Sequence, residues 1–129
     1  MNKYFYIMED TLKRHYAAID TYPRKLTLKY NNEIIAESQN ALILKEIAKS
    51  VYNPVFYFPK EDIKADLFNE TERKSYCPIK GDASYWNFKE NPTSDYLAWS
   101  YENALPRTKK IEGYIAFNLD QITLISEPM

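Results

Sequence analysis

The residues with the greatest chemical potential lie in the segment SYCPIKGDASYW, residues 75–86. It contains the only cysteine of the chain, Cys77, and places Lys80 three residues later, directly before Gly81. A turn with this spacing can bring both side chains to one point, where a lysine ammonium favours the nucleophilic thiolate. Gly81 would let backbone N–H groups approach a ligand closely. The alternative is that Cys77 is a small buried hydrophobic residue and Lys80 a solvated surface charge.

Titratable residues elsewhere could assist such chemistry. Glu61 and Asp62 lie in the segment PKED, residues 59–62, which follows the apolar run VFYF, and Asp62 is the candidate acid or base. Asp82, next to the Cys-Lys segment, is a carboxylate of the same rank, and exposed turn carboxylates are the alternative interpretation. The only histidine, His15, could meet Cys77 only through the fold, and a lone histidine is more often structural.

Aromatic residues are dense enough to form the walls of a site, at 16% of the chain. Strand alternation puts Trp99 with Tyr101 on one face of the run YLAWSY, and Trp86 with Phe88 on one face of SYWNF. Such side chains can line a ligand pocket in which tyrosine hydroxyls act as polar groups. Core packing is the alternative interpretation of the same residues.

Composition excludes several classes of protein. The chain has 129 residues, 45% of them hydrophobic and 27% charged, which predicts one folded domain. A net charge of -1 leaves no positive field for nucleic acid. One cysteine with one histidine predicts neither a disulfide framework nor any of the usual zinc sites. The N-terminal apolar run YFYIM is too short for an export signal or a membrane span. We expect a cytoplasmic protein that binds no metal, nucleic acid or membrane, and composition says nothing of its oligomeric state.

The pattern of apolar residues predicts a mainly β fold. Helical spacing predicts a short helix over residues 9–20, and period-two alternation predicts a strand from Arg24 to Tyr30. Asn31 and Asn32 are typical of the tight turn of a hairpin. The run 41–51 fits either a helix or a strand, and a strand is favoured for its first half. VFYF, between two prolines, predicts a buried central strand, so we expect Tyr57 or Phe56 to be almost fully buried with Lys60 and Glu61 exposed.

The chain resembles a widespread family, domain of unknown function 427, which also carries a nucleotidyltransferase-like label. The resemblance runs from about Arg24 to Ser126 through the segments VFYFPKEDI, SYCPIKGDASYW, AWSYENALP and IEGYIAFN. It implies a compact single-domain antiparallel β fold, tent-like and similar to Mss4-type sheets, over residues 23–129, after an N-terminal extension over 1–22 that contains the short helix. Many Mss4-type domains hold zinc with paired cysteines, and this chain has one cysteine. The residues that carry the resemblance are Tyr57, Pro59, Asp62, Cys77, Pro78, Lys80, Gly81, Ala83, Tyr85, Trp86, Trp99, Ser100, Tyr101, Pro106, Ile111, Gly113 and Phe117.

These observations predict a domain that binds a small polar or anionic ligand in an aromatic-lined pocket around the segment CPIKG, with Lys80 supplying the positive charge. We expect Lys80→Ala to leave the fold intact and Trp99→Ala to damage it. One alternative is an enzyme in which Cys77, Lys80 and Asp62 are catalytic, although the sequence lacks the paired carboxylates and phosphate loop of a nucleotidyltransferase. Another is a protein-interaction module. The predicted ligand-binding residues are Tyr57, Gly81, Tyr85, Trp86, Trp99 and Tyr101.

Overall fold

The computed structural model describes residues 15–92 and 96–129. Over these residues the chain is built mainly of antiparallel strands, which confirms the predicted fold class. No helix among them is long and apolar enough to cross a membrane. The strands are β1 (Tyr16–Thr21), β2 (Arg24–Tyr30), β3 (Glu33–Ser38), β4 (Leu42–Ile47), β5 (Val55–Tyr57), β6 (Phe68–Cys77), β7 (Gly81–Phe88), β8 (Ala98–Ser100), β9 (Ile115–Phe117) and β10 (Thr123–Pro128). The short 3-10 helices are η1 (Lys60–Asp62), η2 (Ala65–Leu67) and η3 (Pro106–Ile111).

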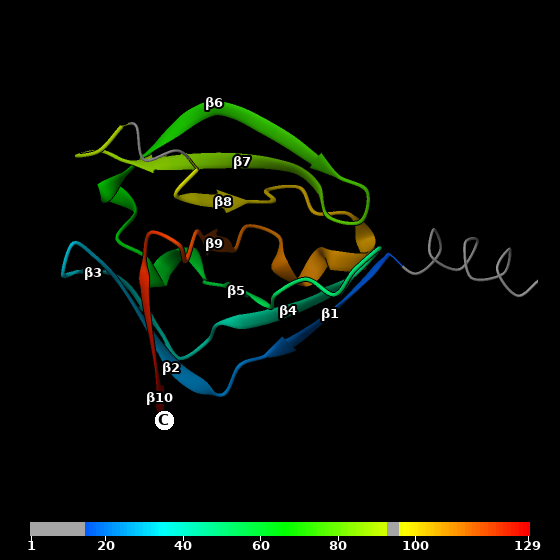
Figure 1. Cartoon of the computed structure of the whole chain (residues 1–129), viewed down its shortest axis with the longest axis horizontal. Coiled ribbons are helices and arrows are strands. Elements are labelled where there is room, and N and C mark those ends of the chain that lie inside the picture. The colour runs from blue at the N-terminus through cyan, green and yellow to red at the C-terminus, as the bar shows by residue number, and fades with distance from the viewer. Residues whose placement is uncertain (1–14, 93–95) are drawn as a thin grey trace, which may run out of the picture.

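The strands form antiparallel sheets in the orders β1-β4-β5, β10-β2-β3 and β6-β7-β8-β9. An isolated bridge between Phe58 and Ile115, with backbone hydrogen bonds of 2.8 and 2.9 Å, joins the end of β5 to β9. Strands β6, β7, β8, β9, β5, β4 and β1 therefore follow one another down the view of Figure 1, while β2, β3 and β10 lie at its lower left. Short β5 therefore links the β1-β4-β5 sheet to the β6-β7-β8-β9 sheet.

Buried side chains form two clusters on either side of the sheet that contains β7 and β8. Directly opposed residues of an antiparallel pair share a face. Tyr85, Trp99 and Ala116 are opposed on one face, and Trp86, Ala98 and Phe117 on the other.

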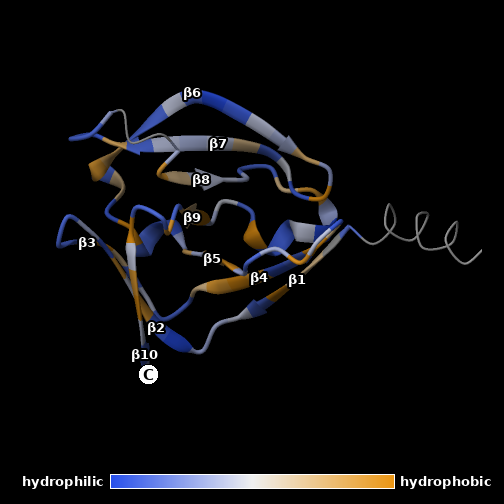
Figure 2. Ribbon diagram, viewed as in Figure 1, coloured by the Kyte–Doolittle hydropathy of each residue, from blue (hydrophilic) through white to orange (hydrophobic). Residues whose placement is uncertain are grey.

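The hydropathy of the strands follows their place in the fold. In Figure 2 β4 is largely hydrophobic, whereas β6, at the edge of its sheet, is mostly polar. The first core contains Leu26, Leu28, Ile35, Phe58, Phe88, Leu97 and Phe117, and the second contains Leu44, Tyr57, Ala83, Tyr101, Ala104, Ile111 and Ala116.

Three local predictions are confirmed. Asn31 and Asn32 adopt φ values of 50° and 65° in the β2–β3 hairpin, which is the conformation that such turns require. The first half of the run 41–51 is strand β4. Tyr57 in VFYF is 0% exposed, and Lys60 and Glu61 directly after that run are exposed.

The predicted helix over residues 9–20 is wrong for residues 16–20, which belong to β1. All six residues of β1 pair with β4, from the Tyr16–Ile47 pair to the Thr21–Leu42 pair. Helical spacing of apolar residues is a weak signal over so short a segment, and pairing with a neighbouring strand overrides it. Residues 9–14 of the predicted helix lie outside the described residues.

Candidate functional site

Four polar side chains from distant parts of the chain meet at one end of β4. Glu46 of β4 lies at the centre: its Oε2 is 2.6 Å from Nε2 of His15, and its Oε1 accepts a hydrogen bond of 2.7 Å from Nζ of Lys80. Cys77, the last residue of β6, has its sulfur within 4.8 Å of ligand atoms of His15 and Glu46. We call His15, Glu46, Cys77 and Lys80 the polar cluster.

Strand pairing explains why these side chains meet. The Tyr16–Ile47 pair of β1 and β4 brings His15 beside the end of β4. Cys77 and Lys80 lie at the two ends of the β6–β7 turn, in which the Lys80 backbone N–H donates to the Cys77 carbonyl at 3.2 Å. The pairing of β1 with β4 depends on contacts remote in sequence, so no local pattern could show that His15 and Glu46 are neighbours.

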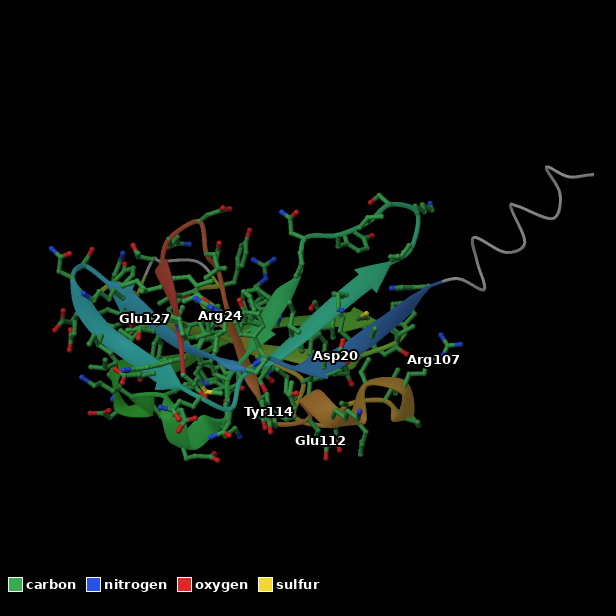
Figure 3. The ribbon with its side chains drawn as sticks, turned by 90° about the horizontal axis from the view of Figure 1, so that it is seen from below. Asp20, Arg24, Arg107, Glu112, Tyr114 and Glu127 are labelled. Atoms are coloured by element: carbon green, nitrogen blue, oxygen red, sulfur yellow. The ribbon has the colours of Figure 1, made fainter. Side chains whose placement is uncertain are left out.

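Helix η3 holds the polar cluster in place from one side. The buried Thr108 hydroxyl donates to the Ile79 carbonyl at 2.9 Å, and the Leu105 backbone N–H donates to the Lys80 carbonyl at 3.2 Å. Arg107 donates from its guanidinium to the His15 carbonyl at 2.8 Å. Figure 3 labels Arg107 on the side of η3 that lies toward the start of β1. The same short helix therefore fixes both the β6–β7 turn and the residue that precedes β1.

Gly81 is required by close packing at the start of β7. Its φ is +100°, which L side chains rarely adopt, and an added Cβ would lie 3.1 Å from the Asn103 carbonyl oxygen and 3.4 Å from Leu105 Cγ. We expect Gly81→Ala to lower the free energy of unfolding by roughly 1–3 kcal/mol. Urea unfolding measures it, with Gly113→Ala as the control, because Gly113 has φ +74° but an added Cβ there would meet no atom of the described residues within 4 Å. Equal losses in the two variants would show that the 103–105 segment plays no part.

The ion pair of Glu46 and Lys80 is largely buried, since their side chains are only 11% and 12% exposed. Burial is the largest influence on the pKa of Glu46 and raises it, but hydrogen bonds and electrostatic attraction from Lys80 and His15 together outweigh burial and hold that pKa below its usual 4.5. Burial likewise lowers the pKa of Lys80, but the neighbouring Tyr57 and Glu46 together keep it above its usual 10.5. The charged forms of both residues are therefore favoured at neutral pH.

Two tyrosines of the second core adjoin the polar cluster. The Lys80 ammonium lies 5.5 Å from the centre of the Tyr101 ring. The Tyr57 hydroxyl is buried and has no hydrogen-bond partner of good geometry among the described residues, although the Trp99 indole lies close enough to lower the pKa of that hydroxyl. Burial raises the pKa of both tyrosines well above 10.0, although the charge of Lys80 acts in the opposite direction on Tyr57. The cluster thus has an aromatic side that contains one unsatisfied hydroxyl.

Several residues of the predicted site lie elsewhere. Asp62 accepts a hydrogen bond of 2.6 Å from the Ser38 hydroxyl and borders a polar cavity of about 270 Å³, to which no member of the polar cluster contributes. Trp86 belongs to the opposite face of the β7–β8 pair from Trp99 and packs against the first core. The two tryptophans therefore cannot form the walls of one site.

Tyr85 and Trp99 lie on the face of the β7–β8 pair that packs against the second core. Tyr85 packs against the second core, and its hydroxyl is 2.7 Å from the Ser75 hydroxyl. Trp99 packs against the same core and also lines an apolar cavity of about 210 Å³. The structure thus brings Cys77, Lys80, Tyr57 and Tyr101 together, with Gly81 supporting the turn. The lining of the apolar cavity comprises Asn53, Pro54, Val55, Phe56, Phe58, Trp99, Phe117, Asn118, Leu119 and Leu124.

Comparison with known protein families matches residues 18–127 to the family described as domain of unknown function (DUF427). The chain belongs to the DUF427 family. The match begins within β1 and ends within β10, so it includes Glu46, Cys77 and Lys80 of the polar cluster but not His15. None of the curated proteins compared with the chain matches it at a significant level. The family description assigns no activity, so a function for this DUF427 domain has to be argued from its own site.

Proposed function

We propose that this DUF427 domain binds a small polar ligand at the polar cluster, with an oxygen atom of the ligand at the Tyr57 hydroxyl and the Lys80 ammonium. One observation carries the proposal: Tyr57 is 0% exposed, and its hydroxyl has no hydrogen-bond partner among the described residues. Buried polar groups nearly always have partners, because an unsatisfied one costs about 1–3 kcal/mol. A ligand oxygen would satisfy this hydroxyl.

The groups around Tyr57 suit an oxygen-bearing ligand. The ammonium of Lys80 has three N–H donors, and one of them donates to Glu46. The other donors can reach a ligand oxygen. The Tyr57 hydroxyl can donate or accept, and the rings of Tyr101 and Trp99 supply aromatic surface beside it. A few polar groups within an aromatic surround are typical of small-molecule sites.

The charge of Lys80 differs from the sequence-based expectation. The sequence predicts that Lys80 supplies positive charge to a ligand, but the carboxylate of Glu46, 2.7 Å away, offsets that charge. An anion therefore gains less Coulombic attraction than an unpaired lysine would give. We propose that neutral carbonyl or hydroxyl compounds bind as well as carboxylates or phosphates, and that hydrogen bonds to Tyr57 and Lys80 select the ligand.

A thermal-shift screen tests the proposal with the Tyr57→Phe variant as its matched control. The panel contains nucleotides, sugar phosphates, carboxylates, neutral sugars and amides. A ligand at 100 times its Kd stabilises the fold by about 2.7 kcal/mol, which raises the melting temperature measurably. We expect at least one class to stabilise the wild type and to stabilise Tyr57→Phe much less.

The unliganded Tyr57→Phe variant has its own expected result. Removing a buried hydroxyl that has no partner should raise the free energy of unfolding by about 1 kcal/mol, because the folded variant no longer contains a desolvated hydroxyl without a hydrogen bond. Thermal melts without ligand measure this. A variant less stable than the wild type would show that the hydroxyl is already satisfied within the protein, and equal ligand shifts in both proteins would remove Tyr57 from the site.

A further inference from the structure

Three side chains of the polar cluster carry donor atoms of the kinds that bind zinc in proteins. A His15 nitrogen, a Glu46 carboxylate oxygen and the Cys77 sulfur lie within 4.8 Å of one another. Cys77 forms no disulfide, and both it and His15 are partly exposed to solvent. Imidazole nitrogen, carboxylate oxygen and thiolate sulfur are the three donor types found in protein zinc sites. The fold therefore assembles a mixed donor set from three separate segments.

We propose that His15, Glu46 and Cys77 bind one zinc ion and leave its fourth position open. Zinc–donor bonds of about 2.0–2.3 Å at tetrahedral angles separate the donor atoms by roughly 3.3–3.8 Å. The contact of 2.6 Å between His15 and Glu46 would have to open, and the sulfur would have to lie within that range. Because the three atoms already lie within 4.8 Å, displacements on the order of 1 Å are enough.

The two oxygens of Glu46 have different partners, which suits a metal ligand. Oε2 faces His15 and is the oxygen available to the ion, while Oε1 accepts from Lys80. Ligating carboxylates are commonly held by a further hydrogen bond of this kind. On the opposite side, the Arg107 guanidinium fixes the backbone carbonyl of His15. Two of the three ligands are thus positioned by neighbouring cations before any ion arrives.

Charge and protons balance at this site. Zinc displaces the proton of the Cys77 thiol, which passes to solvent, and a thiolate–zinc bond forms. The thiolate and the Glu46 carboxylate together offset the two charges of the ion, which leaves Lys80 as the remaining positive charge within the polar cluster. No redox step is involved. The expectation of a metal-free chain rested on cysteine and histidine counts alone, and a carboxylate ligand supplied by a distant strand leaves no such signature.

The zinc site goes beyond the proposed function because it uses different atoms. The proposed ligand contacts the Tyr57 hydroxyl and the Lys80 ammonium, whereas the ion contacts the imidazole of His15, Oε2 of Glu46 and the sulfur of Cys77. Tyr57→Phe therefore separates the two proposals: it should abolish the ligand-induced thermal shift and leave metal affinity unchanged.

Cobalt(II) is the probe for the test, because a thiolate–cobalt bond produces a charge-transfer absorption in the near ultraviolet. The full chain, without a polyhistidine tag, is titrated with Co²⁺ and then with Zn²⁺. We expect one Co²⁺ per chain, the thiolate band, and its loss as Zn²⁺ displaces Co²⁺. Cys77→Ser should abolish the band. His15→Asn should weaken binding by more than the roughly 10–100-fold loss that follows removal of a group that only hydrogen-bonds a ligand.

Asp62→Asn is the matched control, because Asp62 is a carboxylate of the separate polar cavity and should leave Co²⁺ affinity unchanged. Thermal melts confirm that each variant is folded before titration. The proposal is overturned if saturating Co²⁺ gives no thiolate band, or if Cys77→Ser or His15→Asn binds as tightly as the wild type. Binding that Asp62→Asn weakens as much as His15→Asn would equally overturn it.

Discussion

Lys80→Met is expected to lower the free energy of unfolding by about 3 kcal/mol. Removing one partner of a buried ion pair leaves the other charge desolvated and unpaired, which costs roughly 3–5 kcal/mol. The lower end applies because the side chains of Lys80 and Glu46 retain 12% and 11% exposure. Urea unfolding at neutral pH measures the loss, and methionine preserves most of the packing of the lysine stem.

Two controls isolate the ion pair. Lys60→Met removes an exposed pair with Glu102, of similar length at 2.9 Å, and should cost about 0–1 kcal/mol. The double variant Lys80→Met/Glu46→Gln removes both charges and should be more stable than Lys80→Met alone. If Lys80→Met costs no more than Lys60→Met, the pair is not buried in solution and the electrostatic description of the site is wrong.

The pH dependence of stability gives a further test of the ion pair. The pKa of Glu46 is depressed in the folded protein, so its stabilisation is present above its unfolded pKa of about 4.5 and is lost as pH falls through the lower folded value. In Lys80→Met, burial still raises the pKa of Glu46 while the hydrogen bond from Lys80 is lost, so Glu46 takes up a proton at a higher pH than in the wild type. The difference in stability between wild type and Lys80→Met should therefore be largest at neutral pH and shrink as pH falls toward and below 4.5. A difference independent of pH over this range would mean that lost packing, and not lost charge, destabilises the variant.

Trp99→Ala should also cost about 3 kcal/mol, by a different mechanism. Trp99 is opposed to Tyr85 and Ala116, packs against the second core and borders the apolar cavity, so truncation enlarges an existing cavity. Tryptophan-to-alanine changes in cores typically cost roughly 3–5 kcal/mol, and Trp99 is only partly buried. Thermal melts compare it with Tyr76→Ala, whose side chain is 64% exposed. Matching melting temperatures for the two variants would place Trp99 outside the core.

The sequence-based expectation for Lys80→Ala contrasts with the structural one. The sequence predicts a small effect, because a lysine at a polar turn is normally solvated, and a large effect would instead mean a buried lysine paired with a carboxylate such as Asp62 or Asp82. The structure pairs it with Glu46, which lies 34 positions away, and buries both. The sequence shows which residue carries the charge, but only strand pairing shows which carboxylate it meets.

Local patterns predicted the elements well where the physics is local. The Asn31-Asn32 turn, the strand in VFYF and the strand-like first half of the 41–51 run all follow from turn chemistry, alternation or flanking prolines. The N-terminal helix failed because β1 is defined by its partner β4 and not by its own pattern. Because the helix prediction does not include this pairing, it could not place His15 beside Glu46.

The aromatic residues also show that a local pattern does not predict how strands are aligned. Alternation correctly puts Trp99 and Trp86 on definite faces of their own strands. It does not say how the strands are aligned, and the observed register opposes Trp99 to Tyr85, not to Trp86. A one-residue shift would have brought the two tryptophans to the same face. Of the predicted site residues, the structure brings Cys77, Lys80, Tyr57 and Tyr101 together and places Asp62 and Trp86 elsewhere, and the binding site itself stays a prediction.

The central claim is that a small polar ligand binds against the Tyr57 hydroxyl and the Lys80 ammonium. The most direct test is a crystal structure of the wild-type protein with the compound that gives the largest thermal shift. We predict electron density for that compound with an oxygen in hydrogen-bonding distance of both groups. A compound bound in the apolar cavity beside Trp99, or on the surface, with the Tyr57 hydroxyl still unpartnered, would contradict the claim.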